Sequence, residues 1–200
     1  MYPLIDHYLP VYQFRERHAI TVRRRPETVL AATMTCDLGQ SALVRTLFKL
    51  RGLPAGNITL EGMQAVGFRI LDQRPGHELV IGLIGRFWTY SGGIHRFAPE
   101  QFATLQRPGL AKAATNFRVE APAGGFTRLS TETRIWCSSP SSRQRFGFYW
   151  FLIRPFSGLV RIEWLRLIKR HAEAAVIRTE GVTTGRPEAM LREYGPGPQP

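Results

Sequence analysis

The sequence predicts an α+β fold in which an antiparallel sheet of six to seven strands packs against one long C-terminal helix. Apolar and polar residues alternate in residues 14–22, which is the period of a half-buried strand, and from about 57 to 137 the turn signals are those of an antiparallel sheet. After residue 139 the apolar spacing changes to three and four, the period of a helix. Two hundred residues are enough to bury one core. We therefore expect one domain over residues 1–175, followed by a flexible tail at 176–200.

Residues 14–22, FRERHAITV, predict the first strand. Phe14 and Ile20 fall on one face of such a strand, and the arginines between them fall on the other face. Glu16 and His18 share the apolar face, so both side chains are expected to point toward the interior.

Two short helices are predicted after this strand. In the first, Pro26 takes the first helical position, and Glu27 lies in the first turn, where the helix dipole favours it. Asp37 is a candidate N-cap for the second helix. The apolar face of that second helix is expected to consist of Leu43, Leu47 and Leu50.

Turn signals divide residues 57–137 into antiparallel strands. RPGH at 74–77, the glycine pair at 92–93 and AGG at 123–125 each predict a turn between two strands. A short helical insert begins at Pro99. The strands predicted beside these turns cover 66–73, 78–85, 86–90, 93–97, 113–122 and 126–137.

The alternation in the last hairpin places Phe117 on the same side of the sheet as Thr131 and Thr133. Two hydroxyls on an apolar wall suit a pocket that fixes the orientation of a ligand. They could equally bond to neighbouring backbone in a dry core. Glu132 and Arg134 fall on the opposite side, where we expect a surface ion pair that contributes little to stability.

The C-terminal helix is predicted to begin after Ser139, a candidate N-cap, with Pro140 at the first helical position. Pro155 costs about 3 kcal/mol inside a helix and predicts a kink. One apolar stripe follows the helical spacing and consists of Phe146, Trp150, Ile153, Ser157, Val160, Trp164 and Ile168.

The apolar run at 146–160 does not predict a membrane-spanning helix. It contains Arg154 and Pro155, and it is shorter than the roughly 20 residues needed to cross a bilayer. Arg143, Arg154 and Arg161 line up beside the apolar stripe, so their stems can cover its flank while their charged ends reach water.

The net charge of +12 raises the question of nucleic-acid or membrane binding. Only three of the 27 basic residues are lysines, and most of the arginines are scattered along the chain. We therefore interpret the charge as a solvated basic surface and expect no specific nucleic-acid partner.

Cys36 and Cys137 lie a hundred residues apart and form neither a metal-binding spacing nor a redox pair. We expect two buried thiols in a reducing cytoplasm. The N-terminus lacks the unbroken apolar run of a signal peptide. The sequence thus predicts a cytoplasmic protein without a cofactor or a bound metal.

Seven stretches in this order resemble bacterial proteins of the START-like (SRPBCC) superfamily. They are LPVYQFRERHAITV, RPETVLAA, LVRTLFKLRGLP, ELVIGLIGRFW, NFRVE, LSTETRIWC and FYWFLIRPFSGLVR. The resemblance implies a helix-grip fold, in which a curved antiparallel sheet holds the long helix and leaves a hydrophobic cavity between them. Members of this superfamily bind lipids, sterols, polyketides or other apolar small molecules, and a minority are cyclases or hydrolysis-stimulating factors.

The function expected first is a non-catalytic carrier or sensor for an apolar small molecule such as a lipid or polyketide, bound between sheet and helix. The residues predicted to line its site are Phe68, Trp88, Phe117, Thr131, Thr133, Phe146, Trp150 and Ile153.

Two alternatives remain open. In an enzyme of the polyketide cyclase or dehydratase type, Glu16 and His18, or Glu132, would transfer protons, since a buried carboxylate beside an imidazole can act as acid or base. Glu16 and His18 could instead be a strand-end carboxylate and a hydrogen-bonded core histidine. The other alternative is a partner-binding role, in which the arginine-rich outer faces contact an acidic protein, a membrane or a nucleic acid.

Overall fold

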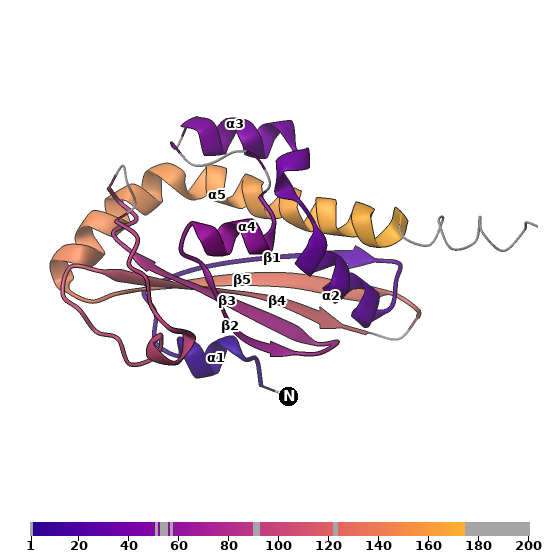
Figure 1. The fold of residues 1–200 in the computed structure, drawn as a ribbon, viewed down its shortest axis with the longest axis horizontal. Helices are drawn as coiled ribbons and strands as arrows, with labels where there is room; N and C mark the ends of the chain where they lie inside the picture. The colour runs from indigo at the N-terminus through magenta and orange to yellow at the C-terminus, as the bar shows by residue number, and fades with distance from the viewer. Residues whose placement is uncertain are drawn as a thin grey trace, which may run out of the picture.

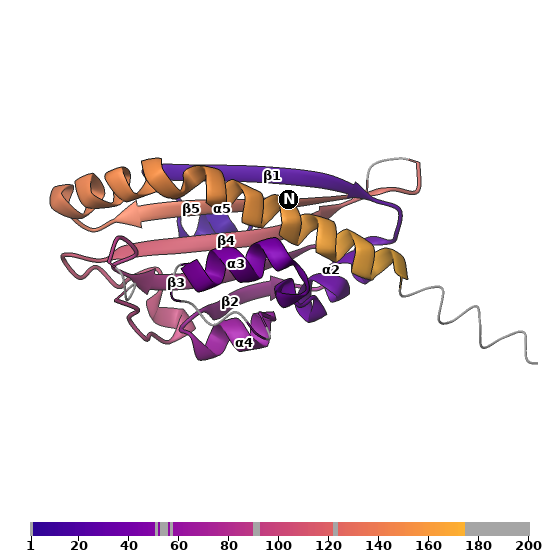
Figure 2. The same cartoon turned by 90° about the horizontal axis from the view of Figure 1, so that it is seen from above.

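The computed structural model describes residues 2–50, 52, 56, 58–89, 93–121 and 124–174. These residues form a five-stranded antiparallel sheet in the order β1-β5-β4-β3-β2. Helix α5 (Pro140–Ala174) lies along one face of the sheet (Figures 1 and 2). The arrangement is consistent with the predicted helix-grip fold. The strands are β1 (Phe14–Val22), β2 (Arg69–Arg74), β3 (Glu78–Gly85), β4 (Ala111–Glu120) and β5 (Thr127–Cys137).

The predicted count of six to seven strands is wrong, because the segments at 86–89 and 93–97 do not form strands. The chain turns as soon as β3 ends, where the backbone N–H of Thr89 donates to the carbonyl of Arg86 at 2.8 Å. On the return, an isolated bridge between His95 and Ile84 pairs this segment with the sheet, and no ladder forms in its described residues. Tyr90, the last residue of one predicted strand, lies outside the described residues, as does Gly92 of the predicted turn.

The two helices predicted after β1 are present as α2 (Pro26–Thr35) and α3 (Ala42–Leu50). Asp37 is a cap, but it caps the short 3-10 turn at Leu38–Gln40, where its carboxylate accepts from the N–H of Gly39 at 2.7 Å. The predicted apolar face of α3 is also shifted. Val44 is fully buried, whereas Leu43 and Leu50 are exposed.

Two short helices were not expected from the sequence, namely α1 (Ile5–Tyr8) and α4 (Leu60–Ala65). Helix α1 lies on the face of the sheet opposite to α5 (Figure 1). There Ile5 and Leu9 pack with Val80, Ile84 and other apolar residues in a second hydrophobic cluster. Both faces of the sheet are therefore covered.

This second layer corrects the expectation of a surface ion pair between Glu132 and Arg134. Both residues are buried, and Arg134 Nε lies 2.7 Å from Glu132 Oε1. The N-terminal segment covers them, because Arg134 also contacts Asp6 at 2.7 Å and donates to the carbonyl of Leu9 at 3.1 Å. The side of the sheet was predicted correctly, but that side is not the surface of the protein.

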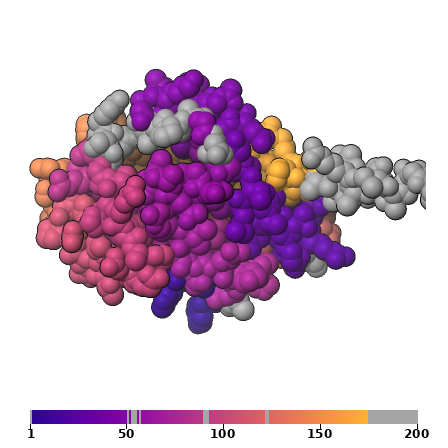
Figure 3. All heavy atoms as spheres, in the orientation of Figure 1, coloured from indigo at the N-terminus to yellow at the C-terminus, as the bar shows by residue number. Residues whose placement is uncertain are grey.

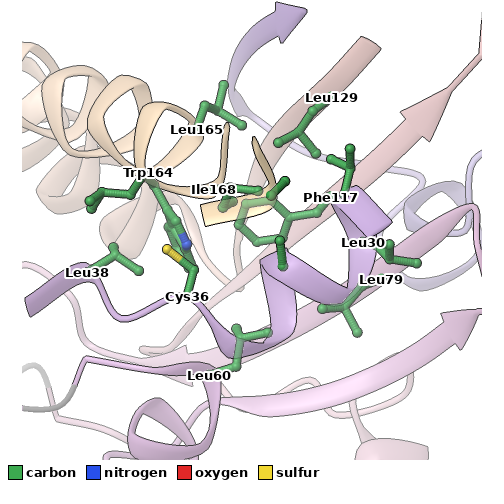
Figure 4. Packing of buried hydrophobic residues seen from close by; sticks show 14 of the residues in the cluster. Leu30, Cys36, Leu38, Leu60, Leu79, Phe117, Leu129, Trp164, Leu165 and Ile168 are labelled. Carbon is green, nitrogen blue, oxygen red and sulfur yellow. The ribbon is translucent and has the colours of Figure 1, made fainter. Parts of the chain in front are cut away.

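The main core lies between the other face of the sheet and helices α2, α4 and α5. Phe117 of β4 pairs in register with Thr131 of β5, as the alternation predicted. Its ring meets Trp164 of α5 edge to face, with centroids 4.7 Å apart. Figure 4 shows these aromatic rings among leucines contributed by several elements.

Helix α5 begins as predicted, with the Ser139 hydroxyl accepting from the N–H of Ser142 at 3.1 Å. Phe146, Trp164 and Ile168 of its apolar stripe are buried. The helix continues through Pro155 and changes direction along its length (Figures 1 and 2). The predicted tail at 176–200 lies outside the described residues.

Helix α3 stands apart from the sheet on the same side as α5, at the top of the molecule as drawn in Figure 3. The N-terminal residues lie at the bottom of the same view. The candidate site lies between α3, α4, α5 and the sheet.

Candidate functional site

An apolar cavity of about 470 Å³ lies between α5, α3, α4 and the sheet. Helix α3 contributes Leu47 and Phe48, and Met63 comes from α4. Phe68 lies just before β2, and Ile81 lies in β3. The long helix supplies the remaining wall with side chains that include Ile153, Val160 and Trp164. A volume and an apolar lining of this kind are typical of small-molecule sites.

A second depression, of about 550 Å³, lies at the start of α5. Most of its lining side chains are polar, among them Gln13, Ser138 and Arg143. Such a wall is less suited to an apolar molecule than the cavity between helix and sheet.

Arg161 is the one charged side chain among the described residues that line the apolar cavity. Its side chain is only 16% exposed, and its Nε lies 3.5 Å from Glu16 Oε2. Burial lowers the pKa of the guanidinium, and the nearby Glu16 carboxylate acts in the opposite direction. The sequence had placed the charged end of Arg161 in water, but the structure turns it toward Glu16.

Glu16 and His18 lie together on the inward face of β1, as the alternation predicted. Glu16 Oε1 lies 2.9 Å from His18 Nε2, and the Ser157 hydroxyl donates to Glu16 Oε2 at 3.3 Å. Neither Glu16 nor His18 lines the cavity. They are connected to it through Ser157 and Arg161, which do.

A row of polar side chains crosses the sheet from Glu16 to the cavity. Glu16 pairs in register with Thr133, whose hydroxyl lies 2.7 Å from that of Thr115. Thr115 in turn lines the cavity. The row therefore gives one wall of the apolar cavity a polar strip.

Several buried polar atoms have no hydrogen-bond partner within the described part of the chain. They include Arg161 Nε and Trp164 Nε1, which belong to residues lining the cavity, and Thr131 Oγ1, which lies across from His18. Buried donors are normally paired, so such atoms call for an explanation. These atoms have almost no exposed surface, so they are covered by protein and do not face the open space of the cavity.

The structure places the eight predicted ligand-binding residues in three settings. Phe68 and Ile153 line the cavity. Phe117, Thr131 and Thr133 are buried in the core face of β4 and β5. The remaining three residues belong to a separate aromatic cluster near the start of α5, and they are Trp88, Phe146 and Trp150.

That aromatic cluster is well packed. Phe146 stacks on Trp150 with centroids 5.8 Å apart, and Phe14 of β1 meets Phe146 edge to face at 4.9 Å. The cluster supports the first half of α5 beside the cavity. A ligand-binding role for its members stays a prediction.

Sequence reasoning missed the contribution of α3 and of Arg161 to the cavity. Leu47 and Phe48 lie three and four residues after the buried Val44, which is the spacing of a helix face turned to the interior, but residues that face a cavity and residues that face a core follow the same pattern. Arg161 follows Val160 of the predicted stripe, so its closeness to the cavity was visible in the sequence. Its pairing with Glu16, 145 positions earlier in the chain, was not.

Metal and thiol chemistry find no support among the described residues. Nowhere in residues 2–174, apart from the short stretches left undescribed, do three or more His, Cys, Asp or Glu side chains gather in a way that could hold a metal ion. Cys36 and Cys137 are buried free thiols, and burial raises their pKa values to about 11 and about 12. Both thiols are therefore protonated and unreactive at neutral pH.

Comparison with known proteins gives no family assignment. No family model matches the chain, and no curated protein matches it. Two solved structures are similar over most of their length: TTHA0849 from Thermus thermophilus and CalU16 from Micromonospora echinospora. The first is 11% identical with a TM-score of 0.31, covering 81% of this chain and 99% of the other. The second is 15% identical with a TM-score of 0.28, covering 84% and 99%. TM-scores below 0.5 do not establish a shared fold.

Proposed function

We propose that the chain is a START-like protein that binds an apolar small molecule, such as a lipid or polyketide, in the cavity between the sheet and α5. In this proposal it acts as a carrier or sensor and catalyses no reaction. The observation that carries the proposal is the apolar cavity itself, with a volume of about 470 Å³ and walls from α3, α4, α5 and the sheet. Burial of apolar ligand surface there supplies the binding free energy.

The N–H groups of Arg161 and Trp164 are not available to the ligand. Both residues line the cavity, and each has a buried N–H without a hydrogen-bond partner among the described residues. Since Arg161 already faces the Glu16 carboxylate, its charge is largely compensated. Because these N–H groups are covered by protein, the ligand is expected to meet mainly apolar surface.

A cavity-filling variant tests this function. Ile153 lines the cavity, and its neighbour Leu152 is exposed on the outer side of the same helix. Ile153→Trp is expected to weaken binding of a hydrophobic fluorescent dye by roughly tenfold, because the indole occupies the space that the dye needs. Leu152→Trp is the matched control and should leave dye binding unchanged. Equal dye binding by both variants would place the apolar site somewhere other than this cavity.

The contact between Glu16 and His18 favours a second candidate function, an enzyme of the polyketide cyclase or dehydratase type. Their side chains lie 2.9 Å apart and are largely buried, a geometry that suits proton transfer. However, Glu16 is also held by Ser157 and Arg161, and neither Glu16 nor His18 reaches the cavity wall. We therefore place this function second.

The enzyme hypothesis can be tested separately by mutation of His18. If it is correct, the protein converts a poly-β-ketone substrate, and His18→Ala abolishes turnover while thermal unfolding is preserved. Turnover that survives His18→Ala would remove the pair from the mechanism.

A further inference from the structure

Helix α5 has a second apolar face that points away from the sheet. Phe148 and Phe151 are 71% and 78% exposed, and the exposed apolar residues continue along the helix at spacings of three and four. A single exposed apolar side chain needs no explanation, but a contiguous row of large ones marks a contact surface. We call this row the outer stripe; it consists of Phe148, Phe151, Leu152, Pro155, Phe156 and Leu159.

The outer stripe has positive charge around it. Arg145 lies one turn before Phe148, and Arg154 lies beside the middle of the stripe; both are exposed and make no ion pair with another described residue. Residues 140–162 of the helix contain no aspartate or glutamate. Farther along, Arg166 and Arg170 are exposed and share Glu163 as their partner.

The exposed apolar residues of the outer stripe and the arginines near them fit one kind of partner. A second copy of this strongly basic chain would bring arginines against arginines, which electrostatic repulsion opposes. An anionic lipid surface instead binds both the apolar side chains and the positive charges. The exposed aromatic and leucine side chains enter the boundary of the acyl chains, and the arginines contact the lipid head groups. No described helix is long and apolar enough to cross a membrane, so the helix would lie in the surface.

The outer stripe also borders the cavity. Phe156 is exposed and at the same time lines the cavity. Leu50, at the end of α3, is 77% exposed and lines it as well. A molecule that enters or leaves between α3 and α5 therefore passes the outer stripe.

We propose that the outer stripe of α5 docks the protein on an anionic membrane surface, with its aromatic residues in the lipid interface and Arg145 and Arg154 on the head groups. If the cavity holds an apolar ligand, as in the function proposed above, this docking places the mouth of the cavity at the membrane. The docking itself does not require an open cavity, so the two proposals can fail independently.

Vesicle co-sedimentation with the full chain tests the proposal. The protein is expected to bind vesicles of phosphatidylcholine with roughly 30% phosphatidylserine and to bind vesicles of phosphatidylcholine alone at least about tenfold more weakly. Salt at about 0.5 M should weaken the binding, because it screens the arginines. The variant Phe148→Glu/Phe151→Glu should lose binding by roughly tenfold or more. Both side chains are exposed, so the variant should unfold at the wild-type temperature.

The matched control is Val11→Glu. Val11 is 67% exposed and belongs to the N-terminal segment, which covers the other face of the sheet. This variant adds a negative charge at an exposed apolar position outside the outer stripe, so it should retain at least half of the wild-type binding.

Several results would overturn the proposal. They are failure of the wild type to bind anionic vesicles, equal binding to the two vesicle compositions, and full binding by the Phe148→Glu/Phe151→Glu variant. Sedimentation equilibrium in the absence of vesicles provides one more result that would overturn the proposal. Self-association that the same variant abolishes would assign the outer stripe to a second copy of the chain.

Discussion

Arg161 and Glu16 form the electrostatic link between the cavity and the interior of the sheet. Their side chains are 16% and 9% exposed, so each needs the other to offset the loss of hydration. Glu16 has two further contacts, to His18 and to Ser157. The charge on α5 and the charge on β1 are therefore parts of one local network.

Removing the positive member of this network tests its contribution to stability. Arg161→Met is expected to lower the free energy of unfolding by about 2 kcal/mol, because Glu16 keeps only its contacts to His18 and Ser157. Urea denaturation measures the effect. The exposed Arg154→Met serves as the control and should change stability by less than about 0.5 kcal/mol. Similar losses in both variants would show that the pair contributes nothing beyond the packing of an arginine stem.

Two glycines of α5 provide a comparison within one helix. A Cβ at Gly147 would meet only Phe14, at 3.6 Å, whereas a Cβ at Gly158 would lie 2.9 Å from Glu16 Oε1. Gly147→Ala is expected to raise stability by about 0.5 to 1 kcal/mol through helix propensity. Gly158→Ala should lower it by about 1 kcal/mol, since the carboxylate must leave its partners. Thermal unfolding distinguishes the two, and equal stabilisation by both would mean that Glu16 is free to move.

At the scale of elements, the sheet has a covered side that its strand pattern does not reveal. The N-terminal segment with α1 buries Glu132 and Arg134. Burial alone would raise the pKa of the Glu132 carboxyl, but hydrogen bonds and charge from Arg15 and Arg134 outweigh it and hold that pKa below its usual range. A buried charge network therefore fastens α1 to the sheet.

The lowered pKa of Glu132 makes stability depend on pH in a defined direction. The carboxyl releases its proton more readily in the folded state than in the unfolded one, so its contribution is fully present above its unfolded pKa of roughly 4.3. The contribution is lost as the pH falls through the lower, folded pKa. Glu132→Gln is expected to be less stable than wild type at pH 7 and to show a smaller loss of stability on acidification.

Urea midpoints measured from about pH 7 to about pH 3 check this prediction, because the two stability curves should converge at the acidic end. Curves that stay parallel over the whole range would show that Glu132 titrates alike in the folded and unfolded states.

The elements with a clear period could be predicted, and the short ones could not. Glu16 and His18 share the inward face of β1, because two-residue alternation reports burial directly. The strand at 78–85 matches β3, a continuous apolar run bounded by turns and buried on both faces of the sheet. Helices α1 and α4 have only four and six residues, too few for a helical period to appear. The segments at 86–89 and 93–97 have the aromatic residues of strands, yet the turn after β3 ends the pairing.

The candidate site could be predicted only in part, for a related reason. Phe68 and Ile153 were expected at the cavity and do line it. Whether an apolar residue faces a cavity or a filled core depends on the distance between elements, and the residue pattern is the same in both cases. The separation of α3 from the sheet is a tertiary property. The contact between Arg161 and Glu16 likewise joins two distant parts of the chain.

At the scale of the whole molecule, α5 is shared by two surfaces. The apolar stripe that begins at Phe146 packs on the sheet and lines the cavity, and the outer stripe is exposed between arginines. These two surfaces account for the aromatic stretch at 148–158 in an otherwise strongly basic chain. Part of that stretch closes the interior, and part of it remains available for contact with a partner.

Native mass spectrometry shows directly whether the cavity between the sheet and α5 holds an apolar small molecule. The protein is purified from a cell extract, its mass is measured under native conditions, and the same sample is then denatured. If the cavity is occupied, a small apolar molecule is released only on denaturation, and it is missing from Ile153→Trp but present in Leu152→Trp. A native mass equal to that of the bare chain, together with no binding of a hydrophobic dye, would contradict the proposed function and show that the space between helix and sheet serves only packing.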